Sequence, residues 1–175
     1  MPGPFHNIAL VGMMGSGKSS VGPRLAELLG FTFVDVDSLI TQAAGKPIPV
    51  IFENDGEEAF RDLETAHTLA AARAEGLVIA TGGGAVVREV NRAVLLDRCW
   101  TVWLSTSPEE HLRRVTTSER RPVLERSADP LAAVRSILSE RERFYAQAHH
   151  REDTTGLGIE EIAHRLAAAW AALQP

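Results

Sequence analysis

The segment from Gly12 to Ser19 has the residue types and spacing of a phosphate-binding loop, GxxxxGK[ST]. It follows an apolar run at Ile8–Val11, short enough for a buried strand, and precedes apolar residues at helical spacing. In this context, backbone N–H groups at a helix N-terminus can surround phosphates. Lys18 would reach the β- and γ-phosphates, and the Ser19 hydroxyl would ligate Mg²⁺. An ordinary glycine-rich turn is the alternative, but the strand–loop–helix context favours a nucleoside triphosphate site. The residues expected to contact the nucleotide are Gly15, Ser16, Gly17, Lys18, Ser19 and Ser20.

Two carboxylates follow the apolar run at 31–34, namely Asp35 and Asp37. If the backbone is still extended there, their side chains point in opposite directions. One could then face Mg²⁺ and the phosphates while the other faces an acceptor. Helix capping is the alternative role for such a pair, and Asp37 is expected also to cap the helix that follows. The neighbouring phosphate loop favours the functional role.

Two further features are weak signals when taken alone. Gly82, Gly83 and Gly84 follow the apolar run at 77–80, and their bare backbone could approach a small ligand or form a flexible turn. Arg61 lies near the start of a long helical pattern, where Glu64 or Glu57 could hold it and aim it at an anion. As an isolated residue, Arg61 fits a surface position better than a ligand-binding one.

Short apolar runs alternate with helical patterns along the chain. Such alternation predicts an α/β fold in three layers, with a parallel sheet covered by helices on both faces. Ligands of such sheets bind at the carboxyl ends of the strands. We expect one domain over 1–175. Strands are expected at 8–11, 31–34, 77–80, 99–104 and 152–155, and helices at 21–29, 39–44, 57–74, 91–96, 129–148 and 159–173, with a further helix starting at 107–110.

Composition excludes several classes of protein. The formal net charge of −5 argues against nonspecific nucleic-acid binding, which needs a basic surface. The single cysteine, Cys99, excludes an internal disulfide and a cysteine metal cluster, and its apolar neighbours predict a buried thiol. No apolar stretch approaches the roughly 20 residues that span a bilayer, and the N-terminus is unlike a signal peptide. We therefore expect a cytoplasmic protein without membrane contact.

The charge is uneven, because the segment from His111 to Arg126 holds five arginines against two glutamates. A solvated helix face is the simple explanation for such a run. Its weak periodicity favours a mobile segment that binds anions.

Taken together, these motifs resemble the shikimate kinase family over nearly the whole chain. The segments that carry the resemblance are GMMGSGKSS, the DVD after the second strand, IFENDGEEAFRDLE, ATGGGAVV, ERRPVL and RERFY. The resemblance implies a P-loop kinase fold like that of nucleoside monophosphate kinases, with a five-stranded parallel sheet. It also implies a substrate-binding helical segment at about 37–64 and a lid at about 113–127.

The family's activity is transfer of the γ-phosphate of ATP, with Mg²⁺, to the 3-hydroxyl of shikimate, on the route to chorismate and the aromatic amino acids. By their positions in the family motifs, one aspartate, two arginines and the glycine run are assigned to shikimate binding by the resemblance. These residues are Asp37, Arg61, Gly82, Gly83, Gly84 and Arg141. Arg121 matches the lid arginine, and Arg114 matches an arginine that flanks the adenine. Lys18, Asp37 and Arg121 are the expected catalytic residues, and Asp35 is expected to reach the metal through water.

The chain departs from the family pattern in places. The run 153–157 lacks the arginine that often contacts adenine after the last strand, and the lid has Pro122-Val123-Leu124 instead of proline and two leucines. His149 and His150 match no motif and are expected at a solvated helix end. Two alternatives remain, a gluconate-type kinase and a nucleotide-dependent regulatory module without catalysis. The chain has no NKxD motif, the base-reading motif of GTPase switches, which argues against a GTPase-type regulatory module. We expect the protein to be a monomer.

Overall fold

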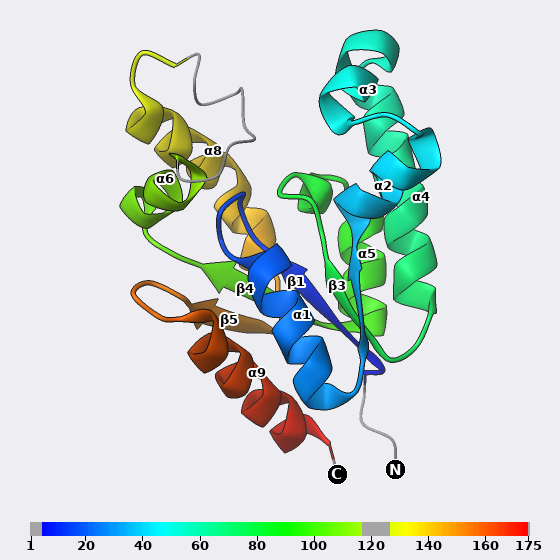
Figure 1. Cartoon of the computed structure of the whole chain (residues 1–175), viewed down its shortest axis with the longest axis vertical. Helices are drawn as coiled ribbons and strands as arrows, with labels where there is room; N and C mark the ends of the chain where they lie inside the picture. The colour runs from blue at the N-terminus through cyan, green and yellow to red at the C-terminus, as the bar shows by residue number, and fades with distance from the viewer. Residues whose placement is uncertain (1–4, 117–126, 175) are drawn as a thin grey trace.

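A five-stranded parallel sheet forms the centre of the protein, seen in a computed structural model that describes residues 5–116 and 127–174 (Figure 1). The strands are β1 (Asn7–Val11), β2 (Thr32–Asp35), β3 (Leu77–Ala80), β4 (Cys99–Ser105) and β5 (His150–Asp153). Their order in the sheet is β2-β3-β1-β4-β5, so β1 is central. Leu10 is in register with Ala80 of β3 and Val102 of β4, which brings the carboxyl ends of the three strands together.

Helices cover both faces of the sheet, because the central strands are apolar on both sides. Ile8 and Leu10 of β1 belong to one buried cluster, and Ala9 and Val11 belong to the other. The first cluster lies beneath α1 (Lys18–Leu29) and α9 (Ile159–Leu173), which lie side by side in Figure 1. The remaining helical elements are α2 (Val36–Ala44), α3 (Ile48–Asp55), α4 (Glu57–Arg73), η1 (Ala85–Val87), α5 (Glu89–Arg98), α6 (Pro108–Thr116) and α8 (Pro130–Tyr145). The predicted three-layer architecture is confirmed.

Helix α2 begins earlier than the sequence pattern predicted. The Asp35 carboxylate accepts a hydrogen bond from the Ser38 amide at 3.1 Å, so Asp35 is the N-cap residue and Asp37 lies in the first turn. The expectation that Asp37 caps this helix is therefore wrong. The condition that the backbone stays extended through Asp37 is not met either, because Val36 is already helical.

Helix α3 was not predicted from the sequence, although prolines at its start are compatible with a helix. Pro47 precedes the helix and Pro49 lies in its first turn, where a missing amide proton costs no hydrogen bond. The start of α6 was predicted correctly, with the Ser107 hydroxyl accepting a hydrogen bond from the Glu110 amide at 3.2 Å. Residues 111–116 are helical, and the other part of the basic run, 117–126, lies outside the described residues.

The two histidines do not lie at a solvated helix end. Helix α8 ends at Tyr145, and His150 is the first residue of β5, paired with Val102. The His149 ring accepts a hydrogen bond from the Thr101 amide at 3.0 Å, and its partial burial lowers its pKa. The strand begins two residues before the predicted start because pairing with β4 continues to His150.

Cys99 is fully buried, as predicted, and this burial raises the pKa of its thiol to about 12. Within residues 5–116 and 127–174, no helix is long and apolar enough to cross a membrane.

Candidate active site

A cleft of about 820 Å³ opens at the carboxyl ends of the central strands. It runs from the loop before α1, past the start of α2 and the glycine run after β3, to α6 and the loop before α9. Of the predicted site residues, the following line it: Gly15, Gly17, Lys18, Ser19, Ser20, Asp35, Asp37, Gly82, Gly83 and Arg114. Residues far apart in sequence therefore share one cavity, as the topology of a parallel sheet requires.

The phosphate-binding loop depends on glycine conformations. Gly12, Gly15 and Gly17 have φ values of 146°, 74° and 100°, which favour glycine. A Cβ atom at Gly12 would lie only 2.6 Å from the Leu104 carbonyl oxygen, so the loop also packs too closely for a side chain. The positions that the sequence singled out are thus required by the backbone itself.

Lys18 is more buried than its expected role suggested. It lines the cleft, but only 8% of it is exposed. Its ammonium group donates to the carbonyl oxygens of Gly12 at 2.6 Å and Met13 at 2.9 Å, and to the Ser16 hydroxyl at 3.3 Å. Lys18 therefore holds the shape of the loop while bringing positive charge to it. Ser16 itself is fully buried.

An oxygen-rich corner lies at the start of α1. The Ser19 hydroxyl donates to Asp35 Oδ2 at 2.7 Å, while Asp35 Oδ1 caps α2. Hydroxyl and carboxylate oxygens suit Mg²⁺, which binds proteins through one or two such groups plus waters and phosphates. Ser19 and Asp35 therefore fit the metal role that the sequence predicted for them.

Acidic and basic side chains approach the glycine run from two sides. A Cβ atom at Gly82 would lie 2.6 Å from Glu64 Oε1 and 3.0 Å from Asp37 Oδ1. A Cβ atom at Gly84 would lie 2.7 Å from an Arg61 nitrogen. Any side chain at these glycines would displace the groups beside them, which explains the run.

Arg61 is held as the sequence predicted, by both of the suggested partners. Its guanidinium lies 2.7 Å from Glu64 and 3.5 Å from Glu57. Glu64 is buried, and this burial raises the pKa of its carboxyl group, although the hydrogen bond from Arg61 opposes the rise. The buried Oε1 of Glu64 has no hydrogen-bond partner among the described residues.

Helix α8 brings two groups to Gly83. The Arg141 Nη1 atom lies 3.6 Å from the position of a Cβ at Gly83. One turn later, the buried Tyr145 hydroxyl donates to the Gly83 carbonyl oxygen at 2.5 Å. Sequence reasoning assigned no role to Tyr145, although its spacing of four from Arg141 puts both on one helix face.

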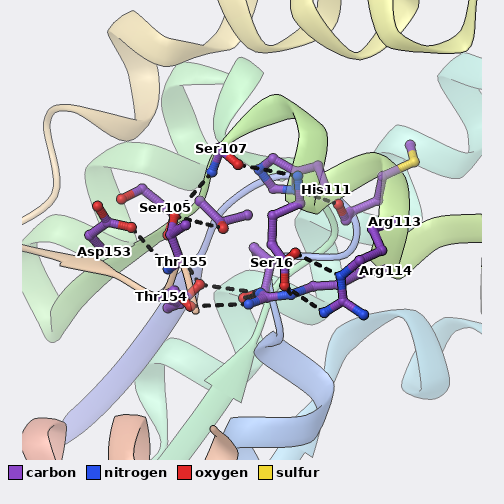
Figure 2. A network of polar contacts seen from close by, with 12 residues as sticks. Ser16, Ser105, Ser107, His111, Arg113, Arg114, Asp153, Thr154 and Thr155 are labelled. Carbon is purple, nitrogen blue, oxygen red and sulfur yellow. Dashed lines mark hydrogen bonds and ion pairs between the residues drawn. The ribbon is translucent and has the colours of Figure 1, made fainter. Parts of the chain in front are cut away.

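Arg114 connects α6 with the phosphate loop and the end of β5 (Figure 2). It donates to Glu110 at 2.9 Å, to the Ser16 carbonyl oxygen at 3.4 Å, and to the hydroxyl and carbonyl oxygens of Thr154 at 3.2 and 3.1 Å. Ion pairs with Arg113 and Arg114 lower the pKa of Glu110 to about 2. Thr154 was missed by sequence reasoning, which looked for an arginine there.

Hydrogen bonds hold the loop after β5 against the start of α6 (Figure 2). Asp153 accepts from the Thr155 amide at 3.0 Å, and the Thr155 hydroxyl accepts from the Ser107 amide at 3.2 Å. The next cleft-lining residues are Gly156, Leu157, Gly158 and Ile159. Arg121 and the three lid residues that follow it lie outside the described residues.

Solved structures with this fold include kinases for two kinds of acceptor. A shikimate kinase from Acinetobacter baumannii, in complex with shikimate, superposes with a TM-score of 0.90 at 37% identity, covering 96% of this chain and 94% of that one. A gluconokinase from Sinorhizobium meliloti has a TM-score of 0.65 at 20% identity, covering 99% and 95% of the two chains. The second likeness shows a shared fold alone.

Sequence relatives separate these possibilities. A shikimate kinase from Nitrobacter winogradskyi is 49% identical over 143 residues, which are 82% of this chain and 66% of the relative. A shikimate kinase from Geobacter metallireducens is 43% identical over 163 residues, covering 92% of this chain and 89% of that protein. The family model for shikimate kinase matches residues 14–171. The chain therefore belongs to the shikimate kinase family.

Proposed function

We propose that this cleft transfers the γ-phosphate of ATP to the 3-hydroxyl of shikimate, giving shikimate 3-phosphate and ADP. One observation carries the assignment of the acceptor site. Asp37, Gly82 and Gly83 line the same cleft as the phosphate loop. Arg61 and Arg141 are not among the lining residues, but they lie beside Gly84 and Gly83 of the same glycine run. This arrangement supports an anionic polyol as the acceptor, because it offers guanidinium groups for a carboxylate and a carboxylate for hydroxyls.

The acceptor is held by charge and by hydrogen-bond direction. Arg61 and Arg141 bind the shikimate carboxylate, since a guanidinium can donate two parallel hydrogen bonds to it. Asp37 accepts from the ring hydroxyls and orients the one that attacks. The Gly82–Gly84 backbone completes the site, with Tyr145 holding the Gly83 carbonyl oxygen. The acceptor segment at about 37–64 includes α2, α3 and the first turns of α4.

Phosphoryl transfer has a loose transition state, so it needs alignment and charge neutralisation more than a strong base. Lys18 and the loop N–H groups hold the β- and γ-phosphates, and Arg114 flanks the adenine. Ser19 directly, and Asp35 through water, would hold Mg²⁺, which when bound would neutralise charge that develops on the phosphate oxygens. Arg121, in the proposed lid at about 113–127, adds positive charge when the lid closes, and closure excludes water.

The chain is proposed to act as a single domain and a monomer in the cytoplasm, independent of nucleic acid and membranes. Its net charge of −5 supports the absence of nucleic-acid binding.

The first test is a coupled assay of ADP release, with shikimate or gluconate as acceptor and with or without Mg²⁺. We expect turnover with shikimate and Mg²⁺ and little with gluconate, because the chain belongs to the shikimate kinase family and shares only its fold with the gluconokinase. Turnover that prefers gluconate would support the alternative kinase. ATP binding without transfer to either acceptor would support the regulatory module.

Arg61→Lys and Arg141→Lys should each weaken shikimate binding by about ten- to a hundred-fold, since a lost charge-assisted pair is worth about 1.5–3 kcal/mol. Lysine retains the charge but lacks the planar fork that binds a carboxylate with two hydrogen bonds. The measurements are KM for shikimate and KM for ATP, and we expect the KM for ATP to be nearly unchanged. Normal shikimate affinity in both variants would move the acceptor site elsewhere.

A further inference from the structure

His111 is a residue of α6 whose side chain faces the phosphate-binding loop (Figure 2). It is 1% exposed, and its Nδ1 atom lies 3.0 Å from the Met14 carbonyl oxygen. The helix packs tightly here, since a Cβ atom at Gly15 would lie 2.8 Å from Val115 Cγ2 and 3.3 Å from the His111 carbonyl oxygen. The loop therefore touches α6 through both backbone and side chains.

Three successive carbonyl oxygens of the loop receive hydrogen bonds. Lys18 donates to those of Gly12 and Met13, and His111 faces that of Met14. In a trans peptide the carbonyl oxygen and the following amide proton point in opposite directions. A donor that holds the Met14 oxygen on the side of α6 therefore turns the Gly15 N–H to the other side. Gly15 lines the cleft.

We propose that His111 is a positioning residue for the phosphate loop, which holds the Met14 carbonyl oxygen so that the Gly15 N–H is aimed at a nucleotide phosphate. The proposal rests on the nucleotide role assigned to this loop above. It requires that Nδ1 carries the proton, because a carbonyl oxygen can only accept.

The burial of His111 favours its neutral form. Burial is the main cause that lowers its pKa to about 4, with smaller contributions from Lys18 and Arg114, while the hydrogen bond to Met14 and the Glu110 carboxylate oppose the shift. The ring is thus neutral at pH 7, where it has one donor and one acceptor nitrogen, and the Met14 contact assigns the donor.

The test compares His111→Asn with His111→Gln. Both replace the ring by a neutral amide, but the Asn nitrogen stands as many bonds from the backbone as Nδ1, whereas the Gln nitrogen stands one bond further. We expect Gln to weaken ADP binding about tenfold, as for a buried carbonyl left without its donor. Asn should stay within about threefold of the wild type, since it restores the hydrogen bond.

Calorimetry of ADP binding, KM for ATP, KM for shikimate and thermal unfolding are measured for both variants. KM for shikimate should be unchanged in both variants. A general loss of structure would change this KM as well, so the measurement distinguishes the two effects. Equal ADP affinity in the two variants, whether normal or weakened, would overturn the proposal. A wild-type protein that fails to bind ADP at all would instead overturn the proposed function of the loop.

A second measurement uses the unmodified protein and so does not depend on folding of a variant. Imidazole ¹⁵N chemical shifts report which ring nitrogen carries the proton. We expect the Nδ1–H form of a neutral ring between pH 5 and pH 8. An Nε2–H form of the neutral ring would overturn the proposal, because the Met14 oxygen would then lack its Nδ1–H donor.

Discussion

Lys18→Met should lower kcat by about 10²-fold or more, the usual effect of removing a group that stabilises charge in a transition state. Methionine has a similar length but no charge, so it leaves the γ-phosphate without its cation. The ammonium also binds the carbonyl oxygens of Gly12 and Met13, and the variant loop should lose part of its shape. ATP affinity is therefore expected to fall together with kcat. Steady-state kinetics with ATP as the varied substrate measures both effects.

Shikimate binding is the internal control for this variant, because Lys18 hydrogen-bonds within the loop and the acceptor groups lie at the glycine run. Equilibrium binding of shikimate should be nearly normal in a variant whose circular dichroism matches the wild type. Near-normal turnover of a folded Lys18→Met protein would show that the assignment of the phosphate loop is wrong.

Asp37→Asn should slow phosphoryl transfer by about 10²-fold. This is the lower end of the effect of removing a positioned acid–base group, and we expect the lower end because a loose transition state needs little base catalysis. The amide keeps the size of the side chain but loses its charge and one acceptor oxygen. Asp37 lies near Gly82 and Glu64 and does not cap α2, so the substitution should leave the fold of α2 intact. Single-turnover kinetics together with ATP binding separates chemistry from nucleotide affinity.

Asp35→Asn is the matched control, since asparagine caps a helix as well as aspartate does. In the wild type, Asp35 Oδ2 accepts a hydrogen bond from the Ser19 hydroxyl in the oxygen-rich corner. Loss of this carboxylate oxygen should raise the Mg²⁺ concentration that the enzyme requires and leave shikimate binding nearly normal. The two variants thus have opposite expected patterns. Loss of ATP binding in Asp37→Asn with normal shikimate binding would mean that the two roles are reversed, with Asp35 as the acceptor contact.

The sequence by itself determined the fold class, the phosphate loop and the succession of strands and helices along the chain, apart from α3 and the short η1. These features depend on local patterns, such as the four-residue strand at Leu77–Ala80 and the helix at Ile159–Leu173, whose observed bounds equal the predicted ones. Local signals suffice where the length of an apolar run, its flanking glycines and its β-branched residues together distinguish a buried strand from a helix. The pair Arg61–Glu64 was also foreseen, since residues three apart on a helix are neighbours.

Only the folded structure decided which of two carboxylates caps α2. In the sequence pattern, Asp35 and Asp37 are equally suited to cap the helix. In the structure the Ser38 amide donates a hydrogen bond to Asp35, which makes Asp35 the N-cap residue. The tertiary structure also brought Tyr145 to Gly83, Thr154 to Arg114 and His111 to Met14. The physical reason is that the last three contacts join groups 40 or more residues apart in the sequence, separations that no helical or strand period describes.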